Sequence, residues 1–241
     1  MATRESRRLA LEGVVIVASI LAAFALDTWW NSVKDGVEEH QVLLSLDTEF
    51  RFAREELQTQ LDLHRRIWGS VEYVRVSLAE GLRDGVSTVA VPDTALGWVF
   101  IPPTTQLVLG TLNGLVGSAR LGIIQDAELR GALAAWGNSL AELTEEEWSV
   151  REFVLSDLDR VFRARMNVDP FRDIGLGVIR GTLTPEELGT RSMVPVDTEM
   201  LGVVVTRFMI QDHLLFEESD PVLAEIDHLL SLIDQRLQAR D

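Results

Sequence analysis

Apolar residues recur at steps of three and four along most of this chain, the spacing that places them on one face of an α-helix. Between residues 43 and 82 this stripe runs without interruption. It predicts one long amphipathic helix, or two nearly continuous ones, over residues 40–82, about 60 Å in length at about 1.5 Å per residue. We expect a bend near Gly36 and an end at Gly81 and Asp84–Gly85, because glycine weakens a helix and readily adopts the left-handed turn that ends one.

The same spacing predicts further helices. One begins at Asp126, an N-cap residue, and continues to about Arg165. Two others close the chain, the first capped by Asp197 and the second opening at Asp220–Pro221. A shorter helix is expected over residues 104–115. These predictions rest on apolar positions that include Leu129, Leu133, Trp136, Leu140, Leu143, Val150, Val154, Leu158, Val161, Met200, Leu201, Val204, Phe208, Leu215, Leu223, Ile226, Leu229, Leu230, Ile233 and Leu237.

Two segments rich in proline and glycine separate the helices. Residues 85–105 and 167–197 are expected to be irregular, with one short edge strand near residues 86–91 and one short helix at the capping box that starts with Thr184. The glycines at 175, 177 and 181 are interpreted as loop flexibility, since their spacing is wrong for a nucleotide-binding loop. The pattern therefore predicts a mainly all-α fold, an antiparallel helical bundle with two irregular connectors.

The beginning of the chain has a different pattern. Residues 13–26 contain no charged side chain, and Trp29 and Trp30 follow directly after Asp27 and Thr28. A mostly apolar segment of roughly 20 residues is long enough to cross a bilayer as a helix, and tryptophan favours the membrane interface. Arg4, Arg7 and Arg8 precede the segment, so we expect the N-terminus to remain in the cytoplasm.

This pattern divides the chain into three parts. Residues 1–12 form a short basic cytoplasmic tail, residues 13–30 a transmembrane helix, and residues 31–241 an exported, acidic helical domain. The expected location is the inner membrane, with a single span and a periplasmic C-terminal domain. Ala18, Ala22 and Ala25 lie on one face of the predicted span, which would allow close contact with another helix.

A cleavable signal peptide is the alternative for the same residues. Three arginines, a short apolar core and the sequence Ala23-Phe24-Ala25 also fit such a peptide, with cleavage after Ala25. The helical pattern continues through that position, which favours a retained anchor. Both alternatives export the remainder of the chain.

Composition narrows the classes of function. The chain is 46% hydrophobic and 25% charged, which is ordinary for a folded protein. The net charge of −16 belongs to the part after the anchor and disfavours nucleic acid and anionic lipid as partners. The absence of cysteine excludes disulfides and thiolate chemistry, and Lys34 is the only lysine.

Two stretches resemble a known group. The anchor with its acidic continuation, VVIVASILAAFALDTWWNSVKD to LLSLDTEF, and the segment PTTQLVLGTLNGLVGSARLGIIQDAELRGALAAW, over residues about 102–136, resemble bacterial single-span membrane proteins that are grouped as a domain of unknown function. The resemblance implies an inner-membrane protein with an exported helical domain. It implies no activity and no catalytic residues.

The search for chemistry yields little. Glu225 and His228 have the Glu-x-x-His spacing of helical di-iron sites, and His213 lies four residues before Glu217, but no second Glu-x-x-His exists. The run of residues 145–147, three consecutive glutamates, is interpreted as a solvated face. We therefore predict no catalytic, metal-binding or cofactor-binding residues, and no enzymatic activity.

Two functions of different classes follow as hypotheses. The first is a structural or accessory subunit that docks onto a larger membrane-protein assembly, for example a photosynthetic or respiratory complex, although no residue specifies the host. The second is an exported ligand-binding or sensory module, with a pocket near Trp98 and residues 167–197. A metal-dependent helical-bundle enzyme is a distant third.

Overall fold

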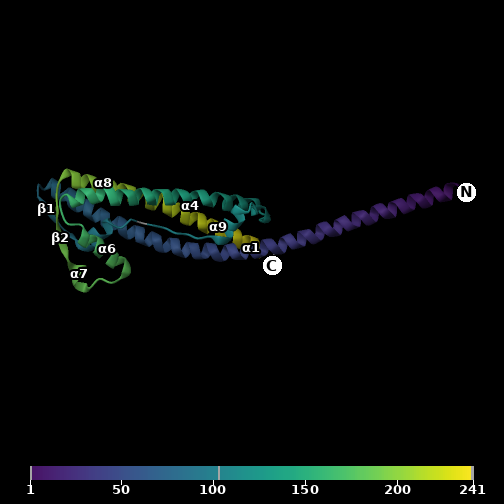
Figure 1. The fold of residues 1–241 in the computed structure, drawn as a ribbon, viewed down its shortest axis with the longest axis horizontal. Coiled ribbons are helices and arrows are strands. Elements are labelled where there is room, and N and C mark those ends of the chain that lie inside the picture. Colours follow the sequence, from purple (N-terminus) through teal and green to yellow (C-terminus); the bar gives the residue numbers. More distant parts are fainter. Residues whose placement is uncertain (1, 103, 240–241) are drawn as a thin grey trace.

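Three long helical rods form the body of the molecule (Figure 1). The computed structural model describes the backbone of residues 2–102 and 104–239, and the side chains of residue 17, residues 19–102 and residues 104–239. The first rod belongs to α1 (Ala2–Arg83). The other two are each composed of helices that follow one another without a loop. The fold is mainly helical, as the sequence predicts.

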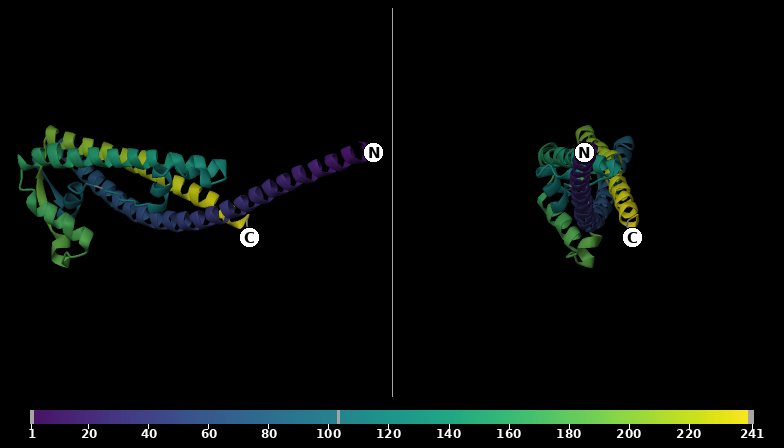
Figure 2. Two further views of the ribbon diagram at one scale, coloured as in Figure 1. Left: turned by 45° about the vertical axis from the view of Figure 1, so that its right-hand side comes forward. Right: turned by 90° about the vertical axis from the view of Figure 1, so that its right-hand side faces the viewer.

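Helix α1 continues without interruption from Ala2 to Arg83, about 120 Å at 1.5 Å per residue. Gly36 lies within this helix and does not break it. The predicted end is confirmed, because Gly85 follows the helix with a φ of 69°. The first part of α1 extends beyond the bundle, and the C-terminal end of the chain lies close to the point where it leaves (Figures 1 and 2).

A long crossover connects the first rod to the second. It contains β1 (Thr88–Pro92), α2 (Asp93–Val99), α3 (Gly110–Gly117) and a 3-10 turn, η1 (Leu121–Ile123). The predicted helix over residues 104–115 is wrong in its first half, because residues 104–109 are extended and run back along the bundle (Figure 1). This return makes the second rod parallel to α1, so the bundle is not antiparallel throughout.

The second rod consists of α4 (Ala127–Phe153), the π-helical segment η2 (Val154–Leu158) and α5 (Asp159–Arg163). Its predicted N-cap is confirmed, since the Asp126 carboxylate accepts a hydrogen bond of 2.9 Å from the Leu129 N–H.

The third rod consists of α8 (Thr198–His213), the π-helical segment η3 (Leu214–Ser219) and α9 (Asp220–Gln238). The predicted N-cap at Asp197 is confirmed, and α9 begins at Asp220 as predicted, but no loop separates it from the helical segment before it. A proline in the first turn of α9 has no N–H to donate, and the wider π turn before it lets the helix continue.

The end of the bundle far from the N-terminus carries α6 (Asp169–Arg180), α7 (Pro185–Gly189) and β2 (Arg191–Pro195). Strand β2 pairs antiparallel with β1. The capping box at Thr184 is confirmed, whereas α6 replaces the expected irregular segment.

The glycines of this region serve packing and helix termination, not loop flexibility. A Cβ on Gly175 would lie 2.7 Å from the carbonyl oxygen of Gly97, so α6 and α2 cross with their backbones in contact. Gly181 ends α6 in the left-handed conformation, with a φ of 65°.

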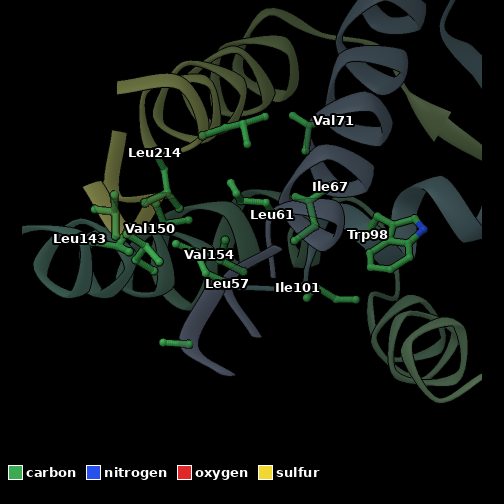
Figure 3. Close-up of a cluster of buried hydrophobic side chains, with 14 of the residues drawn as sticks. Leu57, Leu61, Ile67, Val71, Trp98, Ile101, Leu143, Val150, Val154 and Leu214 are labelled. Carbon is green, nitrogen blue, oxygen red and sulfur yellow. The ribbon is translucent and has the colours of Figure 1, made fainter. Parts of the chain in front are cut away.

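The core is the interior between the three rods. Side chains of α1, α4 and η3, among them Leu57, Leu61, Leu143 and Leu214, point toward one another there (Figure 3). The residues of the predicted apolar stripes are mostly buried, which confirms the helical faces that the sequence indicates.

Within the described residues, the structure contains no helix that is both long and apolar enough to cross a membrane. Part of the predicted span lies outside the description: nothing is described of the side chains of residues 13–16 and Ala18, nor of those of Arg7 and Arg8.

Candidate functional site

A cluster of polar side chains lies inside the bundle, where all three rods meet the crossover. His64 of α1 and Glu147 of α4 are 1% and 5% exposed, and Ser219 at the end of η3 is fully buried. His64 Nδ1 lies 3.4 Å from Ser219 Oγ, and His64 Nε2 lies 3.7 Å from Glu147 Oε1. The second distance exceeds a hydrogen bond, and Nε2 has no hydrogen-bond partner among the described residues.

Thr105 of the crossover completes this cluster. Its backbone N–H donates to Glu147 Oε2 at 2.7 Å, and its hydroxyl donates to Glu147 Oε1 at 2.6 Å. Each carboxylate oxygen therefore accepts one hydrogen bond from the same residue. The pairing ties the start of the non-helical segment 104–109 to the second rod.

The crossover also meets a buried cation. Arg207 of α8 is fully buried; its guanidinium donates to the carbonyl oxygens of Val99 and Ile101 at 3.3 and 3.2 Å, and to Gln211 Oε1 at 2.8 Å. The crossover thus accepts hydrogen bonds from the guanidinium of Arg207 and donates hydrogen bonds to the carboxylate of Glu147. These contacts hold it against the bundle.

Burial shifts the proton affinities of the cluster. It lowers the pKa of His64 to about 4, with smaller contributions from the positive charges of Arg207 and Arg65. It raises the pKa of Glu147 although the hydrogen bonds from Thr105 oppose the rise. The pKa of Arg207 falls to about 9 through burial. At neutral pH, His64 is therefore neutral and Arg207 remains charged.

Both π-helical segments lie near this cluster. Ser219 is the last residue of η3, and its hydroxyl donates to the carbonyl oxygen of Leu214 at 2.8 Å. Segment η2 begins seven residues after Glu147 in the same rod. Single π turns within α-helices frequently occur at functional sites, because they rotate side chains out of the regular helical register.

A surface groove reaches Glu147 from outside. It has a volume of about 670 Å³ and lies between residues 104–106 of the crossover and α4. Its walls are mainly apolar, with Leu140 and Ala141 on α4, and Trp148 at the edge is 65% exposed. The guanidinium of Arg151 lies 5.9 Å from the centre of the Trp148 ring. Glu147 and Thr105, which binds its carboxylate, are both among the residues that line this groove.

The predicted interface residues do not contribute to this site. Trp29 and Trp30 are 60% and 64% exposed on the projecting part of α1, with ring centres 6.4 Å apart. Ala22 and Ala25 are exposed on the same part of the helix. The predicted pocket near Trp98 is not where the groove lies, and the Trp98 side chain is buried against the core.

The residues considered for metal binding are dispersed. His213 Nε2 lies 3.4 Å from Glu218 Oε1. The partner is therefore Glu218 and not Glu217, which the spacing in the sequence suggests. His228 is exposed on α9 and Glu225 is half-buried. Among the described side chains, no group of three or more His, Asp or Glu is placed to hold a metal ion.

The prediction that Glu147 belongs to a solvated face is wrong. Glu145 is exposed, but Glu147 lies four residues after Leu143 and three before Val150, which places it in the buried stripe of α4. The stripe itself was the signal that could have identified this residue. Arg207 could have been identified in the same way, since it follows Val204 by three residues and Met200 by seven, and both belong to the apolar stripe of α8.

Comparison with known proteins adds no family to this description. No model of a protein family, no curated protein and no solved structure matches the chain. The resemblance to bacterial single-span proteins therefore stays a prediction, and function is argued from the residues themselves.

Proposed function

We propose that this protein is a non-catalytic, single-span accessory subunit. In this proposal, the start of α1 anchors the chain in the inner membrane, and the helical bundle docks onto a larger membrane-protein assembly from the periplasmic side.

The proposal rests on the exposed apolar surface of the projecting part of α1. Leu26 lies about 180° around the helix from Val17, and both side chains are more than half exposed. A helix that is apolar on all sides requires an apolar environment on all sides, either lipid or protein. The large exposed side chains of this part are Val17, Ile20, Leu21, Phe24, Leu26, Trp29, Trp30, Val33 and Val37.

The order of residues along α1 agrees with a membrane boundary. The uncharged stretch ends at Leu26, the tryptophan pair follows, and Lys34 and Asp35 come next. Indole rings favour the interface between lipid and water. From Trp30 onward the helix approaches the bundle, where Glu38 pairs with Arg120 and Glu39 accepts a hydrogen bond of 2.7 Å from the Gln125 N–H. The bundle would then begin directly above the headgroups.

Docking onto other subunits is supported by the shape and charge of the molecule. The body carries the whole net charge of −16 and projects along one axis from the proposed membrane surface (Figure 2). An acidic rod of this kind favours cationic partner surfaces. Ala22 and Ala25 on the anchor offer a second contact, since small residues let membrane helices approach closely.

Affinity isolation from native membranes tests this proposal. The full chain with a C-terminal tag, extracted in mild detergent, should co-purify with other membrane subunits in a fixed ratio measured by native mass spectrometry. Ala22→Leu/Ala25→Leu should reduce that recovery, whereas Ala127→Leu/Ala134→Leu on the exposed face of α4 should not. Recovery of the chain alone would contradict the docking function.

A further inference from the structure

The groove over Glu147 has the size and lining of a small-molecule site. Its volume of about 670 Å³ lies within the range of about 300 to 1,000 Å³ that such sites occupy. Gly137 is one of the lining residues and leaves open space, since a Cβ added there would meet no atom within 4 Å. Leu140 and Ala141 provide an apolar wall, so the space suits a compact apolar group.

The charge of the groove selects the kind of ligand. Its charged residues are Glu145, Glu147 and Arg151, two carboxylates and one guanidinium. Arg151 is exposed and lies over the Trp148 ring, and among the described residues it forms no ion pair with Glu147. The lining residues therefore carry more negative than positive charge.

Glu147 has unused capacity to bind a cation. Each carboxylate oxygen can accept two hydrogen bonds, and Thr105 donates one to each. Among the described residues, the one ion-pair partner within 4 Å is His64, which is neutral at pH 7 because its pKa is about 4. A buried carboxylate without a cationic partner is costly, and a cation entering the groove would relieve that cost.

We propose that this groove binds a small organic amine, whose ammonium group pairs with the Glu147 carboxylate and whose apolar body lies along Leu140 and Ala141. The exposed indole of Trp148 can contact the cation at the rim. The site is independent of the proposed docking function, and nothing in it requires the membrane anchor. It would add ligand recognition to an accessory subunit.

Ligand-observed fluorine NMR tests the proposal with defined probes. The full chain in phosphatidylcholine nanodiscs is titrated with 2-(4-fluorophenyl)ethylammonium, and empty nanodiscs provide the blank. The neutral 2-(4-fluorophenyl)ethanol has nearly the same shape and serves as the matched probe. We expect the ammonium to bind at least tenfold more tightly than the alcohol, because a hydrogen bond to a charged group exceeds a neutral one. Its affinity should fall as the pH is lowered and Glu147 becomes protonated, because burial raises the pKa of this carboxyl group.

Three variants locate the binding. Glu147→Gln should weaken ammonium binding at least tenfold, whereas Glu145→Gln, the same change of charge on the exposed rim, should alter it less than threefold. Gly137→Leu should abolish binding by filling the groove without touching the charge. Circular dichroism establishes that each variant folds. Equal binding of both probes, unchanged binding to the Glu147→Gln or Gly137→Leu variant, or no binding at about 10 mM would overturn the proposal.

Discussion

At the scale of single residues, the polar cluster consists of side chains at helix positions that are usually occupied by apolar residues. His64, Glu147 and Arg207 all fall on the inner faces of their helices, and each is at most 5% exposed. A polar group costs free energy at such a position unless it is hydrogen-bonded. The crossover supplies partners to Glu147 and Arg207, while His64 remains neutral beside them.

The position of His64 was predictable, and its surroundings were not. The residue fits the apolar stripe of α1, three residues after Leu61 and four before Trp68. Nothing in the sequence indicates that Glu147 and Ser219 lie next to it or that Thr105 binds Glu147, because these contacts join residues 42 to 155 positions apart. Long-range pairing of this kind follows from the path of the crossover, which periodicity does not determine.

We predict that His64 makes the folded state acid-sensitive. Its pKa is about 4 in the folded state against 6.5 in the unfolded state, so the stability it contributes is complete above pH 6.5 and is lost as the pH falls toward 4. This corresponds to about 2 kcal/mol lost between pH 7 and pH 5. Urea denaturation at pH 7 and pH 5 gives the free energy of unfolding of each protein. Between these pH values, His64→Leu should lose about 2 kcal/mol less of it than the wild type loses.

The matched control is His228→Leu, which removes an exposed histidine of α9. Its free energy of unfolding should fall between the two pH values by as much as that of the wild type. Glu147 acts in the opposite direction, since its raised pKa favours the folded state as the pH falls. This residue is present in the wild type and in both variants, so the comparison between them isolates the effect of His64. Identical pH dependence of His64→Leu and wild type would refute the assignment.

At the scale of elements, the periodicity of apolar residues predicts the long helices, but it does not predict the connections between them. Caps at Asp126, Thr184 and Asp197 are local signals and were predicted. The start of α3 is different, because Glu49 of α1 accepts hydrogen bonds from the Thr111 N–H and hydroxyl at 2.8 and 2.7 Å. A cap supplied by a distant helix has no local signature. The continuous third rod was missed because Asp-Pro usually opens a new helix.

The crossing of α2 and α6 yields a prediction at the same scale. Gly97→Ala should destabilise the protein by about 2 to 3 kcal/mol, because the new Cβ would lie 2.8 Å from the backbone nitrogen of Gly175, which cannot move as a side chain would. Gly131→Ala provides the control on α4, where a Cβ meets nothing within 4 Å, and should stabilise by about 0.5 to 1 kcal/mol. Urea denaturation measures both. Equal stability of the two variants would show that the helices do not cross so closely.

At the scale of the whole molecule, α1 has two parts that pack differently. Its later part provides one of the three rods and buries a continuous apolar stripe, while its first part projects beyond them (Figure 1). The sequence indicates a boundary here, where an all-round apolar pattern changes to a one-sided one, but the membrane span that it predicts for the first part stays a prediction. It could not predict that one helix would continue through both, because Gly36 is tolerated inside a helix at a modest cost.

The most direct test of the proposed anchor compares two pairs of charges on α1. Leu21 and Phe24 are 62% and 66% exposed on the projecting part, and Leu44 and Phe52 are 48% and 68% exposed on the bundle. Each glutamate placed within a membrane span should cost about 2.5 to 3.5 kcal/mol, taking the insertion cost of aspartate for glutamate, whereas one on a solvated surface costs little.

Bacterial cells expressing each variant would be fractionated after carbonate extraction. We predict that the wild type and Leu44→Glu/Phe52→Glu stay in the membrane pellet, and that Leu21→Glu/Phe24→Glu is released into the supernatant as a folded protein. Release of the wild type, or retention of Leu21→Glu/Phe24→Glu in the pellet at the level of its control, would contradict the assignment of this segment to the bilayer.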